Sequence, residues 1–181
     1  MALTNLKNTN NNIGSIQEKL QTGKRINRAA DDAAGLAIAE GFNSIVRGSQ
    51  VAQRNSQDGI SLVQTAEGAL SETQSILQRI RELSVQAANG TQSTNNRAAL
   101  DTEVQQLLAQ IDDIAIDTEF NGISVLSSSQ TVTLQSGANP SQTLNIAVTG
   151  AKTGDLGVST VAVSSMQLAV SAISTIDRAI Q

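Results

Sequence analysis

Residues 55–89 decide the fold, and they read NSQDGISLVQTAEGALSETQSILQRIRELSVQAAN. Small and apolar side chains recur through this stretch at alternating spacings of three and four residues, which is the heptad pattern of a coiled-coil seam. Such a narrow apolar line needs a second helix to cover it. The stretch therefore predicts one long helix packed along another. Its seam residues are Ala66, Leu70, Thr73, Leu77, Ile80, Ser84 and Ala87.

The composition favours closely packed helices over an ordinary globular core. The chain has 181 residues and 18.8 kDa, which suits one elongated domain or two small ones. Only 1% of the residues are aromatic, with two Phe and no Trp or Tyr. Large rings therefore cannot fill a core, and small aliphatic side chains must pack between close, parallel rods.

Charge and missing residue types exclude several classes of function. A net charge of −4, with no cluster of Lys and Arg, argues against nucleic acid as the main partner. The chain contains no His and no Cys, so it lacks the commonest general base and the commonest metal ligands. We expect no enzyme activity, cofactor or metal. No apolar run approaches membrane-spanning length, and the amino terminus lacks a cleavable secretory signal, so export would use another route.

The segments before this stretch are also helical in pattern. A first stripe is interrupted by Asn8 to Asn12, which lowers helix propensity, and it ends at Gly23. Asp31 and Asp32 can cap the next helix, whose pattern then runs to Asn89 with only isolated glycines in it. The first stripe consists of Leu3, Leu6, Ile13, Ile16 and Leu20.

The second half predicts a helix, a hairpin and a further helix. Asn89-Gly90 is a strong stop, with Gly suited to a left-handed position beyond a helix. A stripe of Leu100, Val104, Leu107, Ile111 and Ile114 then runs to about Thr118. Residues 131–134 and 143–148 alternate as a small β-hairpin, and Met166, Val170, Ile173, Ile176 and Ile180 begin a last helix. The predicted fold class is mainly α: an elongated antiparallel helical rod, coiled-coil-like, with a small β-hairpin.

Several blocks in order carry a family resemblance. LQTGKRINRAADDAAGLAIAE (20–40), QRNSQDGISLVQTAEGAL (53–70), LQRIRELSVQAANGT (77–91) and IDDIAIDTEFNGISVL (111–126) resemble the amino-terminal conserved region of bacterial flagellin. The match covers most of residues 6–126. The later LQSGANPSQTLNIAV and LGVSTVAVSS look like the middle of short flagellins, and IDRAI like the start of their returning helix.

The resemblance implies a role and a division of the chain. It implies a structural subunit of the flagellar filament that self-assembles through helix packing for motility and is secreted to the extracellular flagellum. The expected partners are other flagellin subunits, flagellar export and capping proteins, and the flagellin-sensing Toll-like receptor. Residues 1–31 would be a partial inner-tube helix and connecting spoke, 32–126 rod-domain helices, 127–165 the β-hairpin and loop of the rod domain, and 166–181 the start of the returning carboxyl-terminal helix.

Two departures from the family pattern limit this expectation. Met1-Ala2-Leu3-Thr4 stand where the family has an Ile-Asn-Thr-Asn run, and most of the returning helix is absent. In flagellins those two termini pair in the inner tube of the filament. We therefore expect a trimmed rod-domain form without autonomous filament assembly, or a naturally short relative.

The resemblance also implies a receptor contact. It places Gln78, Arg79, Arg81, Glu82, Leu83 and Glu103 where flagellins meet the Toll-like receptor. Spacing alone supports a plainer interpretation, in which Arg79 and Glu82 form an i,i+3 pair on a solvated face and Leu83 is ordinary seam packing. Spacing alone favours the plainer interpretation, and the resemblance shifts the preference to receptor contact.

Three hypotheses follow. The first is a flagellin subunit, and the second is the hook–filament junction protein or another coiled-coil interaction module. The third is a carboxylate hydrolase or cation binder built on Asp31-Asp32, Asp112-Asp113, Asp117 and Glu119. Neighbouring helix residues point about 100° apart, so neither Asp pair converges on one atom. Asp58-Gly59, Glu67-Gly68 and Asn121-Gly122 lack the spacing of a phosphate loop and are interpreted as close-packing or turn positions.

Overall fold

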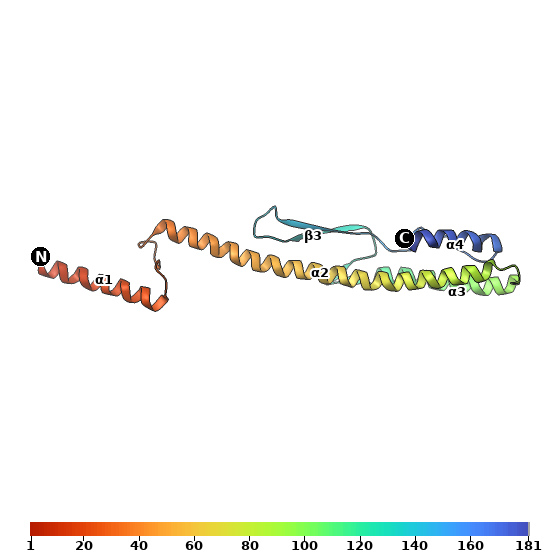
Figure 1. Cartoon of the computed structure of the whole chain (residues 1–181), viewed down its shortest axis with the longest axis horizontal. Coiled ribbons are helices and arrows are strands. Elements are labelled where there is room, and N and C mark those ends of the chain that lie inside the picture. The colour runs from red at the N-terminus through yellow and green to blue at the C-terminus, as the bar shows by residue number, and fades with distance from the viewer. Residues whose placement is uncertain (181) are drawn as a thin grey trace. The chain divides into compact units, whose positions relative to one another are not determined.

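The computed structural model describes residues 1–180, which form two compact units. Unit 1 comprises residues 1–53 and 137–142, and unit 2 comprises residues 54–136 and the chain from Thr143 on. The mainly α class with a small antiparallel hairpin is confirmed (Figure 1). In chain order the elements are α1 (Ala2–Thr22), α2 (Ala33–Ala88), α3 (Thr94–Asp117), β1 (Glu119–Phe120), β2 (Ile123–Ser124), β3 (Gln130–Gln135), β4 (Thr143–Val148) and α4 (Met166–Ile180).

Unit 1 contains an uncovered helix and a structured connection. α1 ends at Gly23, whose φ of 64° is the left-handed conformation that Gly adopts without a Cβ penalty. No residue of α1 is buried, so the predicted apolar stripe faces solvent. Asp31 accepts the backbone N–H groups of Asn27 and Arg28, and Asp32 accepts that of Gly35 at 2.8 Å. The prediction that this Asp pair caps the next helix is thereby confirmed for Asp32.

The long helix α2 runs through its glycines without a break, as the pattern predicted. Six of the seven seam residues are buried, and the two polar ones among them satisfy their hydroxyls locally: Thr73 donates to the carbonyl of Ala69 and Ser84 to that of Ile80. Leu70 is the exception, because 43% of its surface is exposed. Its prediction as a seam residue was wrong, since Leu70 lines a groove between α2, β4 and the end of α4.

The end of α2 differs from the prediction for Gly90. Among the glycines of the described chain, only Gly23, Gly122 and Gly157 have positive φ, so Gly90 is not left-handed. The terminal carbonyls are instead satisfied by Arg97 of α3, whose guanidinium donates to Ala87 O at 2.8 Å and to Asn89 O at 3.0 Å. A basic side chain suits this place because the carboxyl end of a helix carries partial negative charge.

The third helix buries a broader face than its stripe predicted. α3 starts at the cap Ser93, which accepts the N–H of Asn96. Val104 and Ile111 are fully buried as predicted, whereas Leu100, Leu107 and Ile114 are only partly buried. Leu108 and Ala115, which the stripe omitted, are buried. The face is broad because the loop after β4 also packs against α3.

That loop, residues 149–165, is held to α3 by three polar side chains. Asp112 accepts both the N–H and the hydroxyl of Thr153, at 2.8 and 3.0 Å. Asp101 accepts the N–H of Val163 at 2.6 Å, and Gln105 donates to Val161 O at 3.0 Å. The loop can then place three valines in the main core of unit 2. These are Val158, Val161 and Val163.

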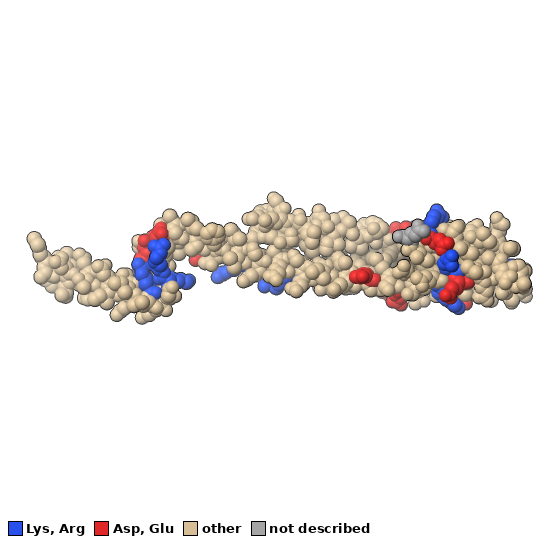
Figure 2. Space-filling model, in the orientation of Figure 1, with Lys and Arg blue, Asp and Glu red and all other residues tan. Residues whose placement is uncertain are grey.

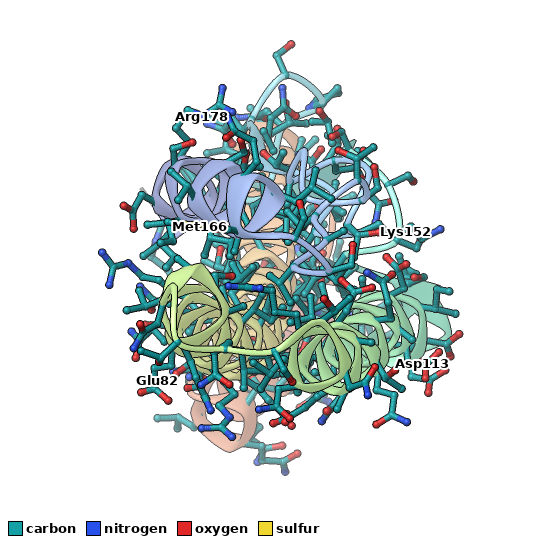
Figure 3. All side chains as sticks on the ribbon, turned by 90° about the vertical axis from the view of Figure 1, so that its right-hand side faces the viewer. Glu82, Asp113, Lys152, Met166 and Arg178 are labelled. Atoms are coloured by element: carbon teal, nitrogen blue, oxygen red, sulfur yellow. The ribbon has the colours of Figure 1, made fainter. Side chains whose placement is uncertain are left out.

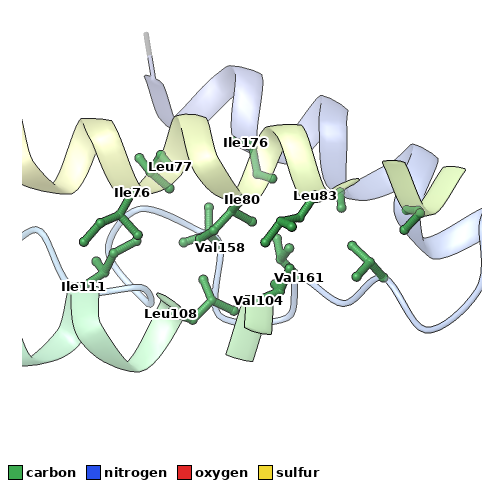
Figure 4. Packing of buried hydrophobic residues seen from close by; sticks show 14 residues of the cluster. Ile76, Leu77, Ile80, Leu83, Val104, Leu108, Ile111, Val158, Val161 and Ile176 are labelled. Atoms are coloured by element: carbon green, nitrogen blue, oxygen red, sulfur yellow. The ribbon is translucent and has the colours of Figure 1, made fainter. Parts of the chain in front are cut away.

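The last helix completes this core with small residues. α4 buries Ala169, Ala172 and Ile176 against α2, α3 and the loop (Figure 4). The predicted stripe was wrong at Met166 and Val170, which are 52% and 54% exposed. Alanines let helix backbones approach closely, and α4 packs through Ala169 and Ala172 instead of the larger side chains that follow them by one position. Seen end-on, α2, α3 and α4 surround a common core (Figure 3).

Two hairpins follow α3. The predicted pairing of residues 131–134 with 143–148 is confirmed: β3 and β4 are antiparallel, with Gln130 opposite Val148 and Gln135 opposite Thr143. A shorter hairpin, β1–β2, turns at Asn121 and Gly122, whose φ values of 52° and 75° suit a two-residue turn with both residues left-handed. Gly59 is a close-packing position as predicted, because an added Cβ would lie 2.2 Å from Leu134.

Candidate recognition surface

Two arginines on the exposed face of α2 each join it to a neighbouring helix. Arg79 donates to Glu82 at 3.2 Å, within α2, and to Glu103 of α3 at 3.0 Å. Arg81 donates to Asp177 of α4 at 2.6 Å. The structure thus brings Arg79, Glu82 and Glu103 together as one cluster, which we call the Arg79 triad.

The triad is a surface feature and not a buried network. The side chains of Arg79, Glu82 and Glu103 are 53%, 70% and 44% exposed, so water screens their attraction. The hydrogen bonds that Arg79 donates, first to Glu103 and then to Glu82, raise its pKa, and the hydrogen bond that Arg81 donates to Asp177 raises the pKa of Arg81. Both guanidinium groups therefore stay cationic, while their geometry is held by carboxylates on adjacent helices.

The other predicted contact residues divide into two groups. Gln78 is exposed on the same helix as the triad. Leu83 is only 1% exposed and lies in the core with Ile80 and Val104. In this structure Leu83 offers no exposed apolar surface, because it turns toward α3 and the loop valines. Leu83 packs beneath the surface that the arginines form.

Sequence reasoning missed Asp177 and Arg97 at this end of unit 2. Asp177 lies 96 positions from Arg81, and no local spacing connects the two. Arg97 had one available signal, since a basic residue shortly after a helix stop can satisfy the last carbonyls. Figure 2 shows charged side chains gathered over the region where α2, α3 and α4 run together, and a second group at the connection between α1 and α2.

Of the six carboxylates that could suggest hydrolysis or cation binding, three accept hydrogen bonds from nearby groups and three are exposed. Asp112 holds Thr153, Asp31 and Asp32 hold turn amides, and Asp113, Asp117 and Glu119 are exposed. Within residues 1–180 no three acidic side chains are grouped as cation ligands. Their positions favour structural and surface roles over a shared reacting centre.

Unit 2 also has an apolar groove beside α2. It has a volume of about 860 Å³ and lies between α2, β4 and the last residues of α4. The exposed side chains of Val63 and Leu70 line it, and a smaller apolar hollow of about 280 Å³ adjoins it at Val63 and Ile146. No described helix is long and apolar enough to cross a membrane.

Comparison with known proteins decides the family. Residues 1–131 match the model of the bacterial flagellin N-terminal helical region. The chain belongs to the bacterial flagellin family. A flagellin of Serratia marcescens is 45% identical over 160 residues, which is 88% of this chain and 46% of the relative. Phase 1 flagellin of Salmonella naestved is 48% identical over 142 residues, which is 78% of this chain and 28% of the relative.

A solved structure agrees with this assignment. The crystal structure of Bacillus cereus flagellin superposes with a TM-score of 0.59 at 33% identity, over 71% of this chain and 76% of that one. The flagellin resemblance of the four sequence blocks is thereby confirmed. This flagellin chain spans about half the length of the Serratia relative and little more than a quarter of the Salmonella relative.

Proposed function

We propose that this flagellin chain is a structural subunit of the bacterial flagellar filament and packs against other flagellin subunits through helix faces. The observation that carries the proposal is α1, which has an apolar stripe and no buried residue. Exposed large apolar side chains in line mark a surface that a partner covers. The five side chains are Leu3, Leu6, Ile13, Ile16 and Leu20, between 47% and 85% exposed.

In this role the chain has the partners and location of a filament protein. Export and capping proteins would handle it on its way out of the cell, and the assembled filament would serve motility outside. The family relationship supports these partners. The helical architecture supports a structural task over catalysis, because its charged groups hold helices and loops together.

Co-sedimentation with sheared bacterial flagellar filaments tests subunit packing. Ile13→Asp places a charge in the α1 stripe, and Asn11→Asp places the same charge on the opposite side of the helix. We expect Ile13→Asp to lower the bound amount at least about tenfold, since burying one isoleucine contributes about 1.5–3 kcal/mol. Asn11→Asp should bind like the unaltered chain. Equal binding of the two variants would remove the stripe from the proposed interface.

We further propose that the Arg79 triad, with Gln78 and Arg81, is read by the flagellin-sensing Toll-like receptor. Arg79 is held by two carboxylates, so little side-chain freedom remains to be lost on binding. Arginine is also among the residues that most often dominate interface energies. Leu83 would support this surface from below and make no direct contact.

A binding titration against the receptor ectodomain tests recognition. Arg79→Ala should weaken binding by about 2 kcal/mol, which is roughly 30-fold in Kd. Arg54→Ala is the matched control, because Arg54 is an exposed arginine of α2 away from the triad. Circular dichroism of each variant checks that helicity is retained. An unchanged affinity for folded Arg79→Ala would exclude this residue from the site.

A further inference from the structure

The turn between α2 and α3 places three groups in an arrangement that favours a chemical change. Asn89 and Gly90 begin this turn, and both are exposed. The side-chain oxygen Oδ1 of Asn89 accepts the backbone N–H of Thr91 at 3.1 Å. The backbone N–H of Gly90 donates no hydrogen bond to any of residues 1–180. The Gly90 nitrogen is therefore free, and the Asn89 amide carbonyl is polarised.

We propose that Asn89 is a spontaneous modification site, at which Gly90 converts the asparagine into aspartate and isoaspartate. The Gly90 nitrogen attacks Cγ of Asn89 and gives up its proton to solvent base. The bond from Cγ to Nδ2 then breaks, Nδ2 takes a proton, and ammonia leaves a five-membered succinimide. Water opens this ring at either carbonyl. No oxidant or reductant is needed, and water is the only co-reactant.

Thr91 gives this site an advantage beyond the Asn-Gly pair itself. Negative charge develops on Oδ1 as the Gly90 nitrogen adds to Cγ, and the Thr91 N–H already points at that oxygen. A backbone donor aimed at a developing oxyanion contributes about 10²–10³ in rate at buried enzyme sites. Water competes at an exposed turn, so we expect about tenfold here.

The second Asn-Gly pair of the chain is an internal comparison. Asn121 and Gly122 form the β1–β2 turn, with both residues held at positive φ by the hairpin. No backbone or side-chain group of residues 1–180 donates to the Asn121 side chain. This pair has the same chemical sequence without the positioned donor. The two sites should therefore react at different rates in the folded chain and at equal rates in the unfolded one.

The change at Asn89 would weaken the joint between the two helices. Arg97 donates to the backbone carbonyl of Asn89 at 3.0 Å. In isoaspartate the peptide bond to Gly90 runs through Cβ and Cγ, so the backbone between Cα of residue 89 and Gly90 gains one carbon atom, and the carbonyl that Arg97 contacts becomes a free carboxylate outside the main chain. The longer connection changes how the turn joins α2 to α3. Either product also adds a negative charge at the carboxyl end of α2, where the helix dipole disfavours it. The aged chain should melt at a lower temperature than the fresh chain.

Peptide mapping of the full chain, incubated at mildly alkaline pH and sampled over time, tests the proposal. Trypsin separates the sites into residues 82–97 and 98–152, and fragment spectra locate the mass gain at Asn89 or Asn121. The same incubation in guanidinium chloride gives the reference. We expect Asn89 to react about tenfold faster than Asn121 in the native chain and at the same rate in denaturant. Asn121 reacting as fast as Asn89 in the native chain would overturn the proposal.

Gly90→Ala separates the modification from other ageing. Gly90 has no atom within 4 Å of an added Cβ and no positive φ, so Ala fits without strain. The methyl group hinders attack by the neighbouring nitrogen. The variant should keep both its residue 89 and its melting temperature through the incubation in which the unaltered chain loses both. A melting temperature that falls equally in both chains would refute the link between Asn89 and the weakened joint.

Discussion

Leu83→Ala tests most directly where the core of unit 2 lies. Leu83 is 1% exposed and packs with residues of α2, α3 and the loop after β4, while Leu70 on the same helix is 43% exposed and lines an open groove. Truncating a buried leucine removes its transfer free energy and leaves a cavity, for a total of about 2–5 kcal/mol. Leu70→Ala loses about half of the transfer free energy and leaves no enclosed cavity, so we expect a loss of about 1 kcal/mol in the free energy of unfolding.

Urea and thermal unfolding followed by circular dichroism give both values. At about 2–4 °C per kcal/mol for a chain of this size, Leu83→Ala should lower the melting temperature by roughly 4–20 °C and Leu70→Ala by roughly 2–4 °C. The heptad pattern alone does not give this order, because it predicts packing at both Leu70 and Leu83. A larger loss for Leu70→Ala, or equal losses, would show that the described packing of α2 is wrong.

Three further outcomes follow from the same contacts. Gly59→Ala should destabilise the folded chain by about 1–3 kcal/mol through overpacking. Gly68→Ala, in open space on the same helix, should stabilise it by about 0.5–1 kcal/mol. Urea midpoints of the two variants measure both effects. Asp112→Ala should raise amide hydrogen exchange in residues 150–158 and cost about 1–3 kcal/mol, while exposed Asp113→Ala should leave exchange there unchanged. The pKa of Asp31 lies below its usual 3.8, chiefly because two backbone N–H groups donate hydrogen bonds to the carboxylate. The stability that Asp31 contributes to unit 1 is therefore complete above pH 3.8 and is lost as the pH falls through the lower pKa of the folded chain. NMR titration of Asp31 should give a midpoint under 3.8.

Much of the helical architecture was predictable because it depends on local periodicity. The heptad spacing through residues 66–87 identified a helix and six of its buried positions. Other correct predictions depended on backbone conformation and hydrogen bonds within a few residues, at Gly23, Asp32 and the pair Asn121-Gly122. Such signals need no knowledge of the rest of the chain. The extent of the recognition surface was less predictable, because the sequence does not distinguish a buried leucine such as Leu83 from an exposed leucine that contacts a partner.

The errors share one physical cause: an apolar stripe in the sequence does not identify the segment that packs against it. Leu70 faces a groove, Leu108 is more buried than Leu107, and α4 buries alanines instead of Met166 and Val170. In each case the outcome depends on how closely another backbone approaches. That approach is set by partners far along the chain, which local spacing cannot identify.

The sequence by itself determined the helices, the hairpin β3–β4 and the family, because periodicity, turn residues and ordered blocks are properties of the chain alone. Only the tertiary structure decided which side chains are available at the surface. It paired Arg79 with Glu103, and Arg81 with Asp177, across 24 and 96 positions. It also replaced the expected glycine stop by the Arg97 cap. Long charged side chains choose partners by distance in space, and that distance exists only once the helices have packed.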